Sequence, residues 1–368
     1  MNLSTNLHKA YSEDKMSAHE AQHLAELIAW GPVVFQTTRL MMKFGVLKAL
    51  RESDEGLTET EVARQCGLSP YAAKVLLEAS LSIGTIILNP ESDRYTLTRA
   101  GWYLLVDPSH QVDMDFNHDV NYIGWHRLEE SLREGRPAGL EHFGPWATIY
   151  EGLSSLPEQV QKSWFGFDHF YSDNSFAEAL EIVFRKHSTR SLYDVGGNTG
   201  KWALQCVSFD LDVEVTILDL PQQIEMMREN VAGKPGAERI KGYGINMLDS
   251  ETQFPQREAG LDAIWMSQFL DCFGEEEVVS ILQRARSAMM EDTRLYIMET
   301  FWDRQKYESA AFALTMTSLY FTALANGNSK MYHSADMLRL INEAGLEVET
   351  IYDHIGYGHS IVVCKKNS

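Results

Sequence analysis

The second half of this 368-residue chain alternates short apolar runs with amphipathic helical patterns, and this alternation restricts the fold more than any other feature. Strands that alternate with helices of about 10–15 residues favour a parallel sheet with helices on both faces. The predicted strands span residues 191–196, 213–220, 239–246, 261–269 and 295–301. The predicted helices span residues 200–209, 221–231, 275–290, 309–326 and 334–343.

The end of the chain departs from this pattern. Two further predicted strands, 348–355 and 360–365, are joined by only four residues, Gly356 to His359. Parallel neighbours need a connection of about a dozen residues or more, so these two strands must run antiparallel. We therefore expect an α/β fold with an open, Rossmann-like sheet of seven strands that ends in an antiparallel C-terminal hairpin.

The first 110 residues are mainly helical. Thr58 opens a capping-box pattern before a helix that stops at Gly67, and Pro70 begins the next helix. Two β-rich runs, 85–88 and 94–97, follow. Helix, turn, helix and a two-stranded wing predict a winged-helix domain. The apolar stretch 30–50 predicts that this domain buries a surface against a partner subunit.

The charge of the chain argues against nucleic acid as a partner. The sequence holds 32 Lys and Arg against 52 Asp and Glu, a net charge of -20. Residues 43–107 carry seven basic and nine acidic side chains. The helix that would contact DNA, residues 69–82, has only two charged side chains, Lys74 and Glu78. This domain has neither a basic patch nor an Arg that could bind guanine, so we expect it to serve as a dimerisation or lid module and not to bind DNA.

Several features predict a cytoplasmic protein that has no metal site and does not span a membrane. The four cysteines lie far apart without a CxxC pair, which is typical of reduced thiols. The N-terminal residues are polar and show no signal-peptide core. Residues 309–329 lack charge, but they contain several Thr and Ser and are too short in apolar length to cross a bilayer, so we expect a buried helix there.

A glycine loop follows the first strand of the predicted sheet, in the run Leu192 to Gly200. This turn is where an α/β sheet presents its ligand crevice. The dinucleotide fingerprint fails here, because Asn198 and Lys201 stand where it requires glycine. The phosphate-binding P-loop pattern fails at Val195 and Trp202.

A third pattern, acid-x-Gly-x-Gly-x-Gly, binds S-adenosyl-L-methionine, and here it contains Asp194, Gly196, Asn198 and Gly200. Asn is the non-glycine residue that best tolerates positive φ, so the loop can keep its shape. Asp194 can orient the loop or offset the cationic methionine half of the cofactor. Asp219, at the end of the next strand, is placed to bind the two ribose hydroxyls.

Residues 113–187 are rich in aromatic side chains, among them Trp164, Phe167 and Phe170. Aromatic side chains bury large areas in ordinary cores, and they also stack on flat ligands. The sequence leaves both interpretations open. If the second holds, these three residues line a substrate pocket.

The chain resembles the class I S-adenosylmethionine-dependent methyltransferases, and among them the plant caffeic-acid-type and bacterial small-molecule O-methyltransferases. The resemblance rests on the winged-helix domain, the loop 194–200, the triplet Asp219-Leu220-Pro221, the strand 261–266 and the region 326–346. It implies a homodimer that methylates a small, aromatic hydroxyl acceptor. It also implies three segments: a dimerisation domain at 1–110, a helical linker lining the substrate pocket at 111–187 and a cofactor-binding domain at 188–368.

The resemblance assigns roles to further residues. It places Gly196 against the cofactor, Asp219 at the ribose, and Asn246 and Met247 beside the adenine. Ser267 stands where the family usually has Lys, and Asn326 matches an Asn that helps to hold the phenolic acceptor.

The catalytic positions differ from the family. Asp271 stands where the family has its general-base His; Glu299 matches one flanking Glu, and Met331 replaces the other. A carboxyl group with an ordinary pKa near ~3.9 is a poor base for a phenol with a pKa of about 10. Asp271 can serve only if burial or Glu299 raises its pKa. The alternative is that Asp271 caps the helix that begins near Gly274.

Three functions remain open from the sequence. The first is O-methylation of a small aromatic acceptor, with Asp271 and Glu299 as the catalytic residues. The second is methylation of carbon or nitrogen. The third is a regulatory protein that binds S-adenosylmethionine but has lost catalysis, which the altered catalytic positions favour.

Overall fold

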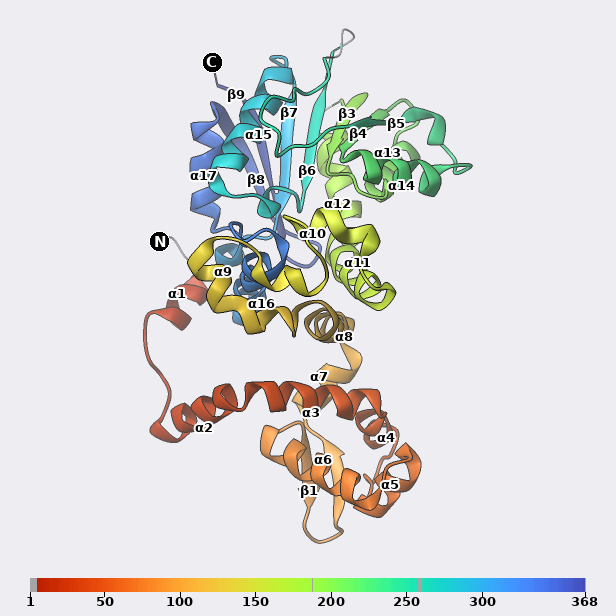
Figure 1. Ribbon diagram of the computed structural model, residues 1–368, viewed down its shortest axis with the longest axis vertical. Coiled ribbons are helices and arrows are strands. Elements are labelled where there is room, and N and C mark those ends of the chain that lie inside the picture. The colour runs from red at the N-terminus through yellow and green to blue at the C-terminus, as the bar shows by residue number, and fades with distance from the viewer. Residues whose placement is uncertain (1–4, 187, 257–259, 368) are drawn as a thin grey trace. The chain divides into compact units, whose positions relative to one another are not determined.

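The computed structural model describes residues 5–186, 188–256 and 260–367, which form two compact units (Figure 1). The smaller unit spans Glu13–Asp119, and the larger combines residues up to Ser12 with Val120–Ser368. The first helix, α1 (Thr5–Tyr11), therefore belongs with the larger unit, whereas the sequence pattern assigned residues 1–110 to one domain. The helical segment 111–187 likewise joins the larger unit from Val120 onward.

The smaller unit contains the expected helices and hairpin. Thr58 accepts a hydrogen bond from the Glu61 N–H at the start of α5, and Gly67 ends that helix in the left-handed conformation. The two strands of the hairpin pair antiparallel. The elements are α2 (Ala18–Ala29), α3 (Gly31–Lys43), α4 (Val46–Arg51), α5 (Glu59–Cys66), α6 (Pro70–Ile83), β1 (Ile86–Asn89), β2 (Arg94–Leu97), α7 (Arg99–Val106) and α8 (Pro108–Asp115).

The apolar stretch 30–50 divides into two parts. Met41, Val46 and Leu47 lie in the core of the smaller unit itself, so this part needs no partner subunit, contrary to the expectation for the whole stretch. The preceding part is different, because Trp30 and Val33 are exposed in the single chain, as is Ile28 of α2.

The larger unit is built on the expected seven-stranded sheet, with strand order β5-β4-β3-β6-β7-β9-β8. Neighbouring pairs among β3 to β7 are parallel, while β9 runs antiparallel to both β7 and β8. The predicted fold class is thus confirmed. The strands are β3 (Ser191–Val195), β4 (Glu214–Asp219), β5 (Ile240–Gly244), β6 (Ala263–Ser267), β7 (Arg294–Glu299), β8 (Leu346–Ile355) and β9 (His359–Lys366).

Helices cover both faces of this sheet (Figure 1). On one face, α15 (Glu275–Ala288) and α17 (Ser334–Glu343) pack on alternate strand residues such as Ile264 and Ile297. On the other face, α13 (Lys201–Phe209) and α14 (Pro221–Val231) pack with residues such as Ile217. Because the five parallel strands point the same way, their carboxyl ends meet at one edge, where a ligand crevice is expected.

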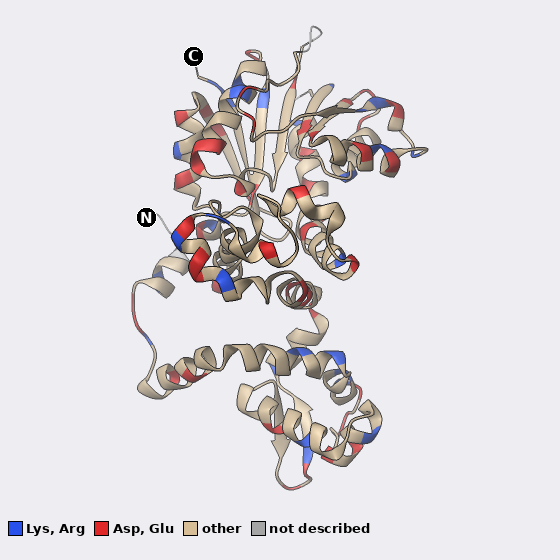
Figure 2. Cartoon of the chain, viewed as in Figure 1, with Lys and Arg blue, Asp and Glu red and all other residues tan. Residues whose placement is uncertain are grey.

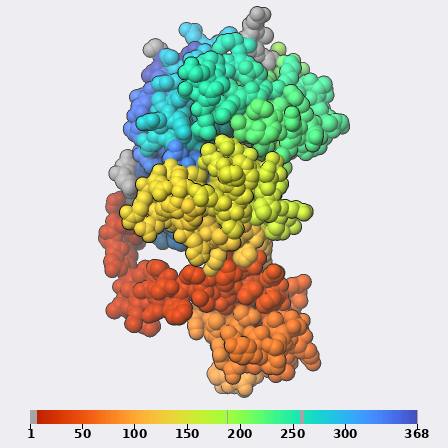
Figure 3. Space-filling model, viewed as in Figure 1, coloured from red at the N-terminus to blue at the C-terminus, as the bar shows by residue number. Residues whose placement is uncertain are grey.

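The remaining helices of the larger unit are mostly short, and the segment from about residue 125 to 180 packs directly on the sheet-bearing segment (Figure 3). Lys and Arg are interspersed with Asp and Glu along the helices (Figure 2). These helices are α9 (Leu128–Glu134), α10 (Ile149–Gly152), α11 (Glu158–Asp173), α12 (Phe176–Leu180) and α16 (Glu308–Tyr320).

Helix α16 corrects one expectation. The uncharged segment 309–329 was expected to form a buried helix, but Phe312 and Met316 of α16 are exposed. Ala311 and Tyr320 of α16 are buried, as is most of the following π-helix η9 (Phe321–Ala325). In the described part of the chain, no helix combines the length and the apolar character that crossing a membrane requires.

Candidate active site

The loop after β3 has the backbone that the glycine pattern predicts. Gly196 and Gly200 adopt positive φ values of 73° and 78°, and Asn198 does so at 48°. The substitution of Asn for Gly is therefore accommodated, as expected from the tolerance of Asn for this conformation. The loop leads directly into α13, which begins at Lys201.

The loop is also tightly packed. A Cβ atom at Gly196 would overlap the ring of Phe269, and a Cβ atom at Gly197 would lie 2.5 Å from Asp194 Oδ2. Glycine is needed at both positions for steric reasons, and at Gly196 for φ as well.

We expect Gly196→Ala to lower the free energy of unfolding by about 1–3 kcal/mol, because Ala would have to adopt a left-handed backbone conformation and displace Phe269. Chemical denaturation measures this change. Gly166→Ala on α11 is the matched control, since a Cβ atom there meets nothing within 4 Å. Equal stabilities of the two variants would contradict the packing described here.

Two carboxyl groups flank the loop. Asp219 Oδ2 accepts a hydrogen bond of 2.8 Å from the Asn198 N–H, and Oδ1 accepts one of 2.7 Å from the Leu220 N–H. Burial raises the pKa of Asp219 to about 6, although these two hydrogen bonds oppose the shift. Asp194 is buried, and burial, with Asp219 nearby, raises its pKa to about 8.

The loop fits the cofactor that its pattern predicts. Within the described residues, three buried polar atoms beside it lack a hydrogen-bond partner: Asp194 Oδ2, Asn198 Oδ1 and Thr199 Oγ1. Unpaired buried polar atoms are costly, so a ligand that pairs them is favoured. The ammonium and sulfonium of S-adenosylmethionine would also favour the ionised forms of Asp194 and Asp219.

The residues assigned to the adenine, Asn246 and Met247, follow β5, and Ser267, also predicted to bind the cofactor, ends β6. Asn246 follows β5, and its Oδ1 accepts a hydrogen bond of 3.0 Å from the Leu248 N–H. Met247 is buried, and Ser267 is the last residue of β6 and is half-buried. All three therefore lie along the same sheet edge as the glycine loop.

The structure brings Asp271 and Glu299 together. Asp271 lies in the short helix η7 (Leu270–Cys272) after β6, and Glu299 is the last residue of the neighbouring strand β7. They are 4 % and 2 % exposed. Glu299 Oε1 accepts hydrogen bonds from the backbone N–H groups of Phe269 (3.1 Å) and Leu270 (2.8 Å), which anchor its carboxyl group beneath the turn that carries Asp271.

Burial shifts the titration of both groups. It raises the pKa of Asp271 to about 7, and the charge of Asp168 adds to this shift. Burial, together with the nearby Asp271, raises the pKa of Glu299 well above its usual range. Asp271 therefore ionises as the pH rises through about 7, and the raised pKa of Glu299 favours the neutral form of that side chain.

Asp271 does not cap α15, so that alternative is wrong. The N-cap residue of the helix is Gly274, and the carboxylate of Glu277 accepts the Gly274 N–H at 2.7 Å. Asp271 Oδ1 instead accepts a long contact of 3.5 Å from Cys272 Sγ.

Helix α11 contributes an acid that the sequence analysis missed. Burial, then the charge of Asp173, raises the pKa of Asp168 to about 7, and this carboxyl group acts electrostatically on Asp271. Its side chain is 28 % exposed, so it borders open space. Asp168 follows Trp164 by four residues, a spacing that places both on one helix face and could have indicated it.

The predicted substrate residues divide by location. Trp164 is buried and donates a hydrogen bond of 2.7 Å to the hydroxyl of Tyr320, which lies close enough to Asp168 and Asp271 to feel their charges. Phe170 stacks on Tyr357, at the turn of the terminal hairpin, with ring centroids 5.2 Å apart. Phe167 packs edge-on against Tyr171.

Asn326 is engaged with the backbone. Its Nδ2 donates to the carbonyl oxygen of Cys272, next to Asp271. Its Oδ1 accepts from the Asn328 N–H and from both the N–H and the hydroxyl of Ser329. These contacts link the side chain of Asn326 to the turn that carries Asp271, and its role in holding the methyl acceptor stays a prediction.

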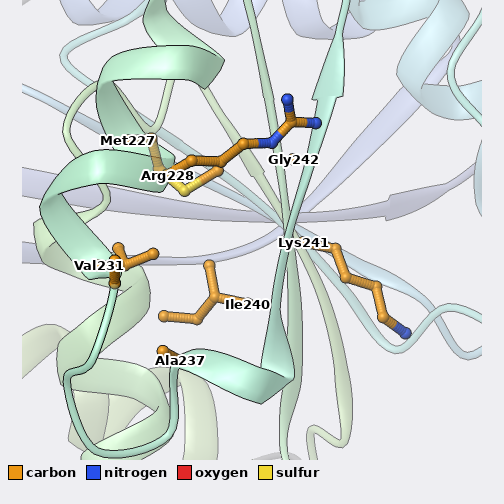
Figure 4. Close-up of a pocket in the computed structure, with 8 residues that line it drawn as sticks. Met227, Arg228, Val231, Ala237, Ile240, Lys241 and Gly242 are labelled. Atoms are coloured by element: carbon orange, nitrogen blue, oxygen red, sulfur yellow. The ribbon is translucent and has the colours of Figure 1, made fainter.

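A hollow of about 450 Å³ lies elsewhere on the larger unit, between α14 and β5 (Figure 4). Its floor is apolar, with Met227, Val231 and Ile240, and Arg228 and Lys241 extend from its border. Its lining contains neither the glycine loop nor the acid pair, so the hollow is not part of the candidate active site.

The description of one protein family, the O-methyltransferase domain, matches residues 125–347, which is more than half of the chain. The chain belongs to the O-methyltransferase family. A second family description, the Dimerisation2-like domain, matches residues 22–95. The family is S-adenosylmethionine-dependent, in agreement with the predicted cofactor.

Curated relatives are similar over most of their length. The chain is 22% identical to the mitomycin biosynthesis 6-O-methyltransferase of Streptomyces lavendulae over 84% of both chains. It is 24% identical to the 3-amino-4-hydroxybenzoate 4-O-methyltransferase of Streptomyces cremeus, over 90% of this chain and 86% of that one. It is 23% identical to the bacteriochlorophyllide d C-20 methyltransferase of Chlorobaculum tepidum, over 76% of this chain and 78% of that one.

A solved structure shows the same fold. The S-adenosylmethionine-dependent methyltransferase SibL superposes with a TM-score of 0.70 at 22% identity, covering 93% of this chain and 98% of that one.

Proposed function

We propose that this O-methyltransferase transfers a methyl group to the hydroxyl oxygen of a small aromatic acceptor, with Asp271 as the base. One observation carries the proposal: Asp271 is buried beside Glu299 at the sheet edge, with its pKa raised to about 7. The hydroxyl-methylating relatives of Streptomyces lavendulae and Streptomyces cremeus support a hydroxyl acceptor, and the latter is named for an aromatic one.

The environment of Asp271 compensates for the missing His. A general base works best when its pKa lies near the working pH. Asp271 meets this requirement, because burial has moved its pKa to about 7, into the range of an ordinary His. When bound, the cofactor supplies an electrophilic methyl group on a sulfonium. In this proposal Glu299 stays protonated beneath the turn, and an Asp271 carboxylate oxygen takes the proton of the acceptor hydroxyl.

Trp164 gives the proposal its aromatic wall. Trp164 lies on the same face of α11 as Asp168. Its indole donates a hydrogen bond to the hydroxyl of Tyr320. A flat ring beside Asp271 could contact this indole. Phe167 and Phe170 are weaker candidates for the same wall, because their ring contacts are with Tyr171 and Tyr357.

Incubation of the protein with methyl-labelled S-adenosylmethionine and a panel of phenols, catechols and cell extract, followed by mass spectrometry, tests this function. The proposal predicts a product labelled on oxygen and an equal amount of S-adenosylhomocysteine. A label on carbon or nitrogen would contradict O-methylation. Of these two alternatives, carbon has more support, because one of the relatives is a C-20 methyltransferase. Tight cofactor binding without any transfer would support the regulatory alternative instead.

We also propose that the protein is a homodimer that assembles through α2 and the start of α3. This surface lies within the Dimerisation2-like match and exposes Leu24, Ile28, Trp30 and Val33, with Ile28 at 70 %. Contiguous exposed apolar surface is typical of a subunit interface.

Ile28→Glu is therefore expected to raise the dimer dissociation constant by about 100-fold or more, since an interface isoleucine contributes ~1.5–3 kcal/mol in each of two subunits. Light scattering across a dilution series measures this. Leu211→Glu, at an equally exposed leucine outside the Dimerisation2-like match, is the control and should leave the mass unchanged. A monomeric mass for the unaltered protein at micromolar concentration would refute the dimer.

A cytoplasmic location and the lack of a nucleic-acid partner stay predictions. The four cysteines are free thiols, which supports a reducing compartment.

A further inference from the structure

A buried arginine lies beneath the loop that follows β5. Arg284 belongs to α15 and is only 6 % exposed. Arginine is rarely buried to this extent without many hydrogen-bond partners.

The guanidinium group holds the loop together from the inside. Its Nη2 donates to the carbonyl oxygen of Met247 at 2.6 Å. Its Nη1 donates to Thr252 Oγ1 at 2.9 Å and, at 3.2 Å, to the carbonyl oxygen of Asp249. One side chain thus connects the beginning, the middle and the end of the segment 247–252.

The loop depends on this side chain for its shape. The turn also has local bonds, from the Thr252 hydroxyl to the Asn246 and Asp249 carbonyl oxygens. These bonds close the turn on itself but do not tie it to the rest of the unit. Arg284 ties the turn to α15, because the guanidinium group that bonds the loop belongs to that helix, and the buried side chain of Met247 packs in the adjacent core.

The loop is connected to the cofactor site at its other end. The Ile245 N–H donates to the carbonyl oxygen of Asp219 at 2.8 Å. Asn246 and Met247 come next, and they are the residues assigned to the adenine. A change in the loop would therefore move the adenine side of the site, while the acid pair, on the turn after β6 and at the end of β7, would remain in place.

We propose that Arg284 is a positioning residue that sets the loop 246–252 in the shape required for the adenine half of S-adenosylmethionine. The inference rests on the proposed placement of Asn246 and Met247 beside the adenine. Lysine cannot take over this role, because an ammonium group lacks the planar fork that reaches Met247 and Thr252 at once.

Arg284→Lys tests the proposal. Calorimetry should show that the dissociation constant of S-adenosylmethionine rises about tenfold, because charged hydrogen bonds that shape the site are lost. At saturating cofactor, kcat and the KM of the acceptor should stay within about twofold of the parent values, since the acid pair is untouched.

Arg286→Lys is the matched control. Arg286 lies on the same helix and also donates to a backbone carbonyl oxygen, that of Gly345, at 2.8 Å. Gly345 precedes β8 and lies outside the adenine loop. Arg286 is half-buried, so we expect this variant to lose some thermal stability but to keep its cofactor affinity.

Thr252→Val provides a second variant that keeps Arg284 and removes its contact with Thr252 Oγ1, together with the bonds of the same hydroxyl to the Asn246 and Asp249 carbonyl oxygens. It should weaken cofactor binding in the same direction as Arg284→Lys, and by less. Equal cofactor affinity of the Arg284→Lys and Arg286→Lys proteins would overturn the proposal, as would a parallel rise in the KM of the acceptor. If calorimetry showed no S-adenosylmethionine binding by the unaltered protein, the proposed function would fail, and this inference with it.

Discussion

Asp271→Asn is expected to lower the kcat of methyl transfer by about 100-fold or more, the usual contribution of a positioned general base. The amide keeps the size of the side chain but cannot take the proton of the acceptor. Cofactor affinity should change little, because the glycine loop and Asp219 lie on other strands. Single-turnover measurements give the rate, and calorimetry gives the affinity.

Glu299→Gln is the matched control for this variant. Burial raises the pKa of Glu299 well above its usual range, which favours its neutral form, and the amide oxygen of Gln can still accept the Phe269 and Leu270 N–H groups. We therefore expect Glu299→Gln to lower kcat far less than Asp271→Asn. If Asp271→Asn retains full turnover, Asp271 is not the base, and proton removal belongs to solvent or to another group.

Asp219→Ala is expected to have the second-largest effect, a rise in the dissociation constant of S-adenosylmethionine of about 10- to 150-fold. This range corresponds to the loss of charged hydrogen bonds to the ribose hydroxyls, ~1.5–3 kcal/mol. The variant also removes the acceptor of the Asn198 N–H, so the glycine loop loses a support. Calorimetry with the unlabelled cofactor measures the change.

Asp219→Asn separates these two causes. Its side-chain oxygen can still accept one backbone N–H, but it carries no charge. An affinity between those of the parent and Asp219→Ala would show that charge and loop support both contribute. Unchanged affinity of Asp219→Ala would rule out the ribose assignment.

The parallel sheet and its antiparallel C-terminal hairpin could be predicted from the sequence because local signals were strong, whereas the order of the strands was not predicted. The connection of four residues between the last two strands excluded a parallel pairing, and β9 is antiparallel to β8 as expected. Likewise, the tolerance of Asn for positive φ predicted the conformation of Asn198.

The parts of the site that the sequence could not predict depend on contacts between distant segments. The pKa of Asp271 is set by burial and by Asp168, about a hundred positions earlier in the chain. No local sequence pattern indicates that Asp168 and Asp271 lie close enough to interact. For the same reason, the resemblance could suggest Asn326 as a ligand of the methyl acceptor, while only the fold shows that its side chain also bonds to Cys272 and Ser329.

Exposure of α16 has a related cause. An uncharged helix is buried only where another part of the protein packs on it. In the single chain, Phe312 and Met316 are exposed. Composition cannot distinguish a helix buried within one chain from a helix that leaves apolar side chains at the surface.

The pH dependence of kcat/KM for an acceptor phenol tests the central claim, that Asp271 is the base of an O-methyltransferase, most directly. The ionised carboxylate is the active form, so the rate should fall as pH drops through about 7, the pKa of Asp271, and should level off above it. The phenol itself titrates near about 10. A rate that climbs tenfold per pH unit through pH 8 and 9 would show that solvent forms the phenolate, and it would contradict the role of Asp271.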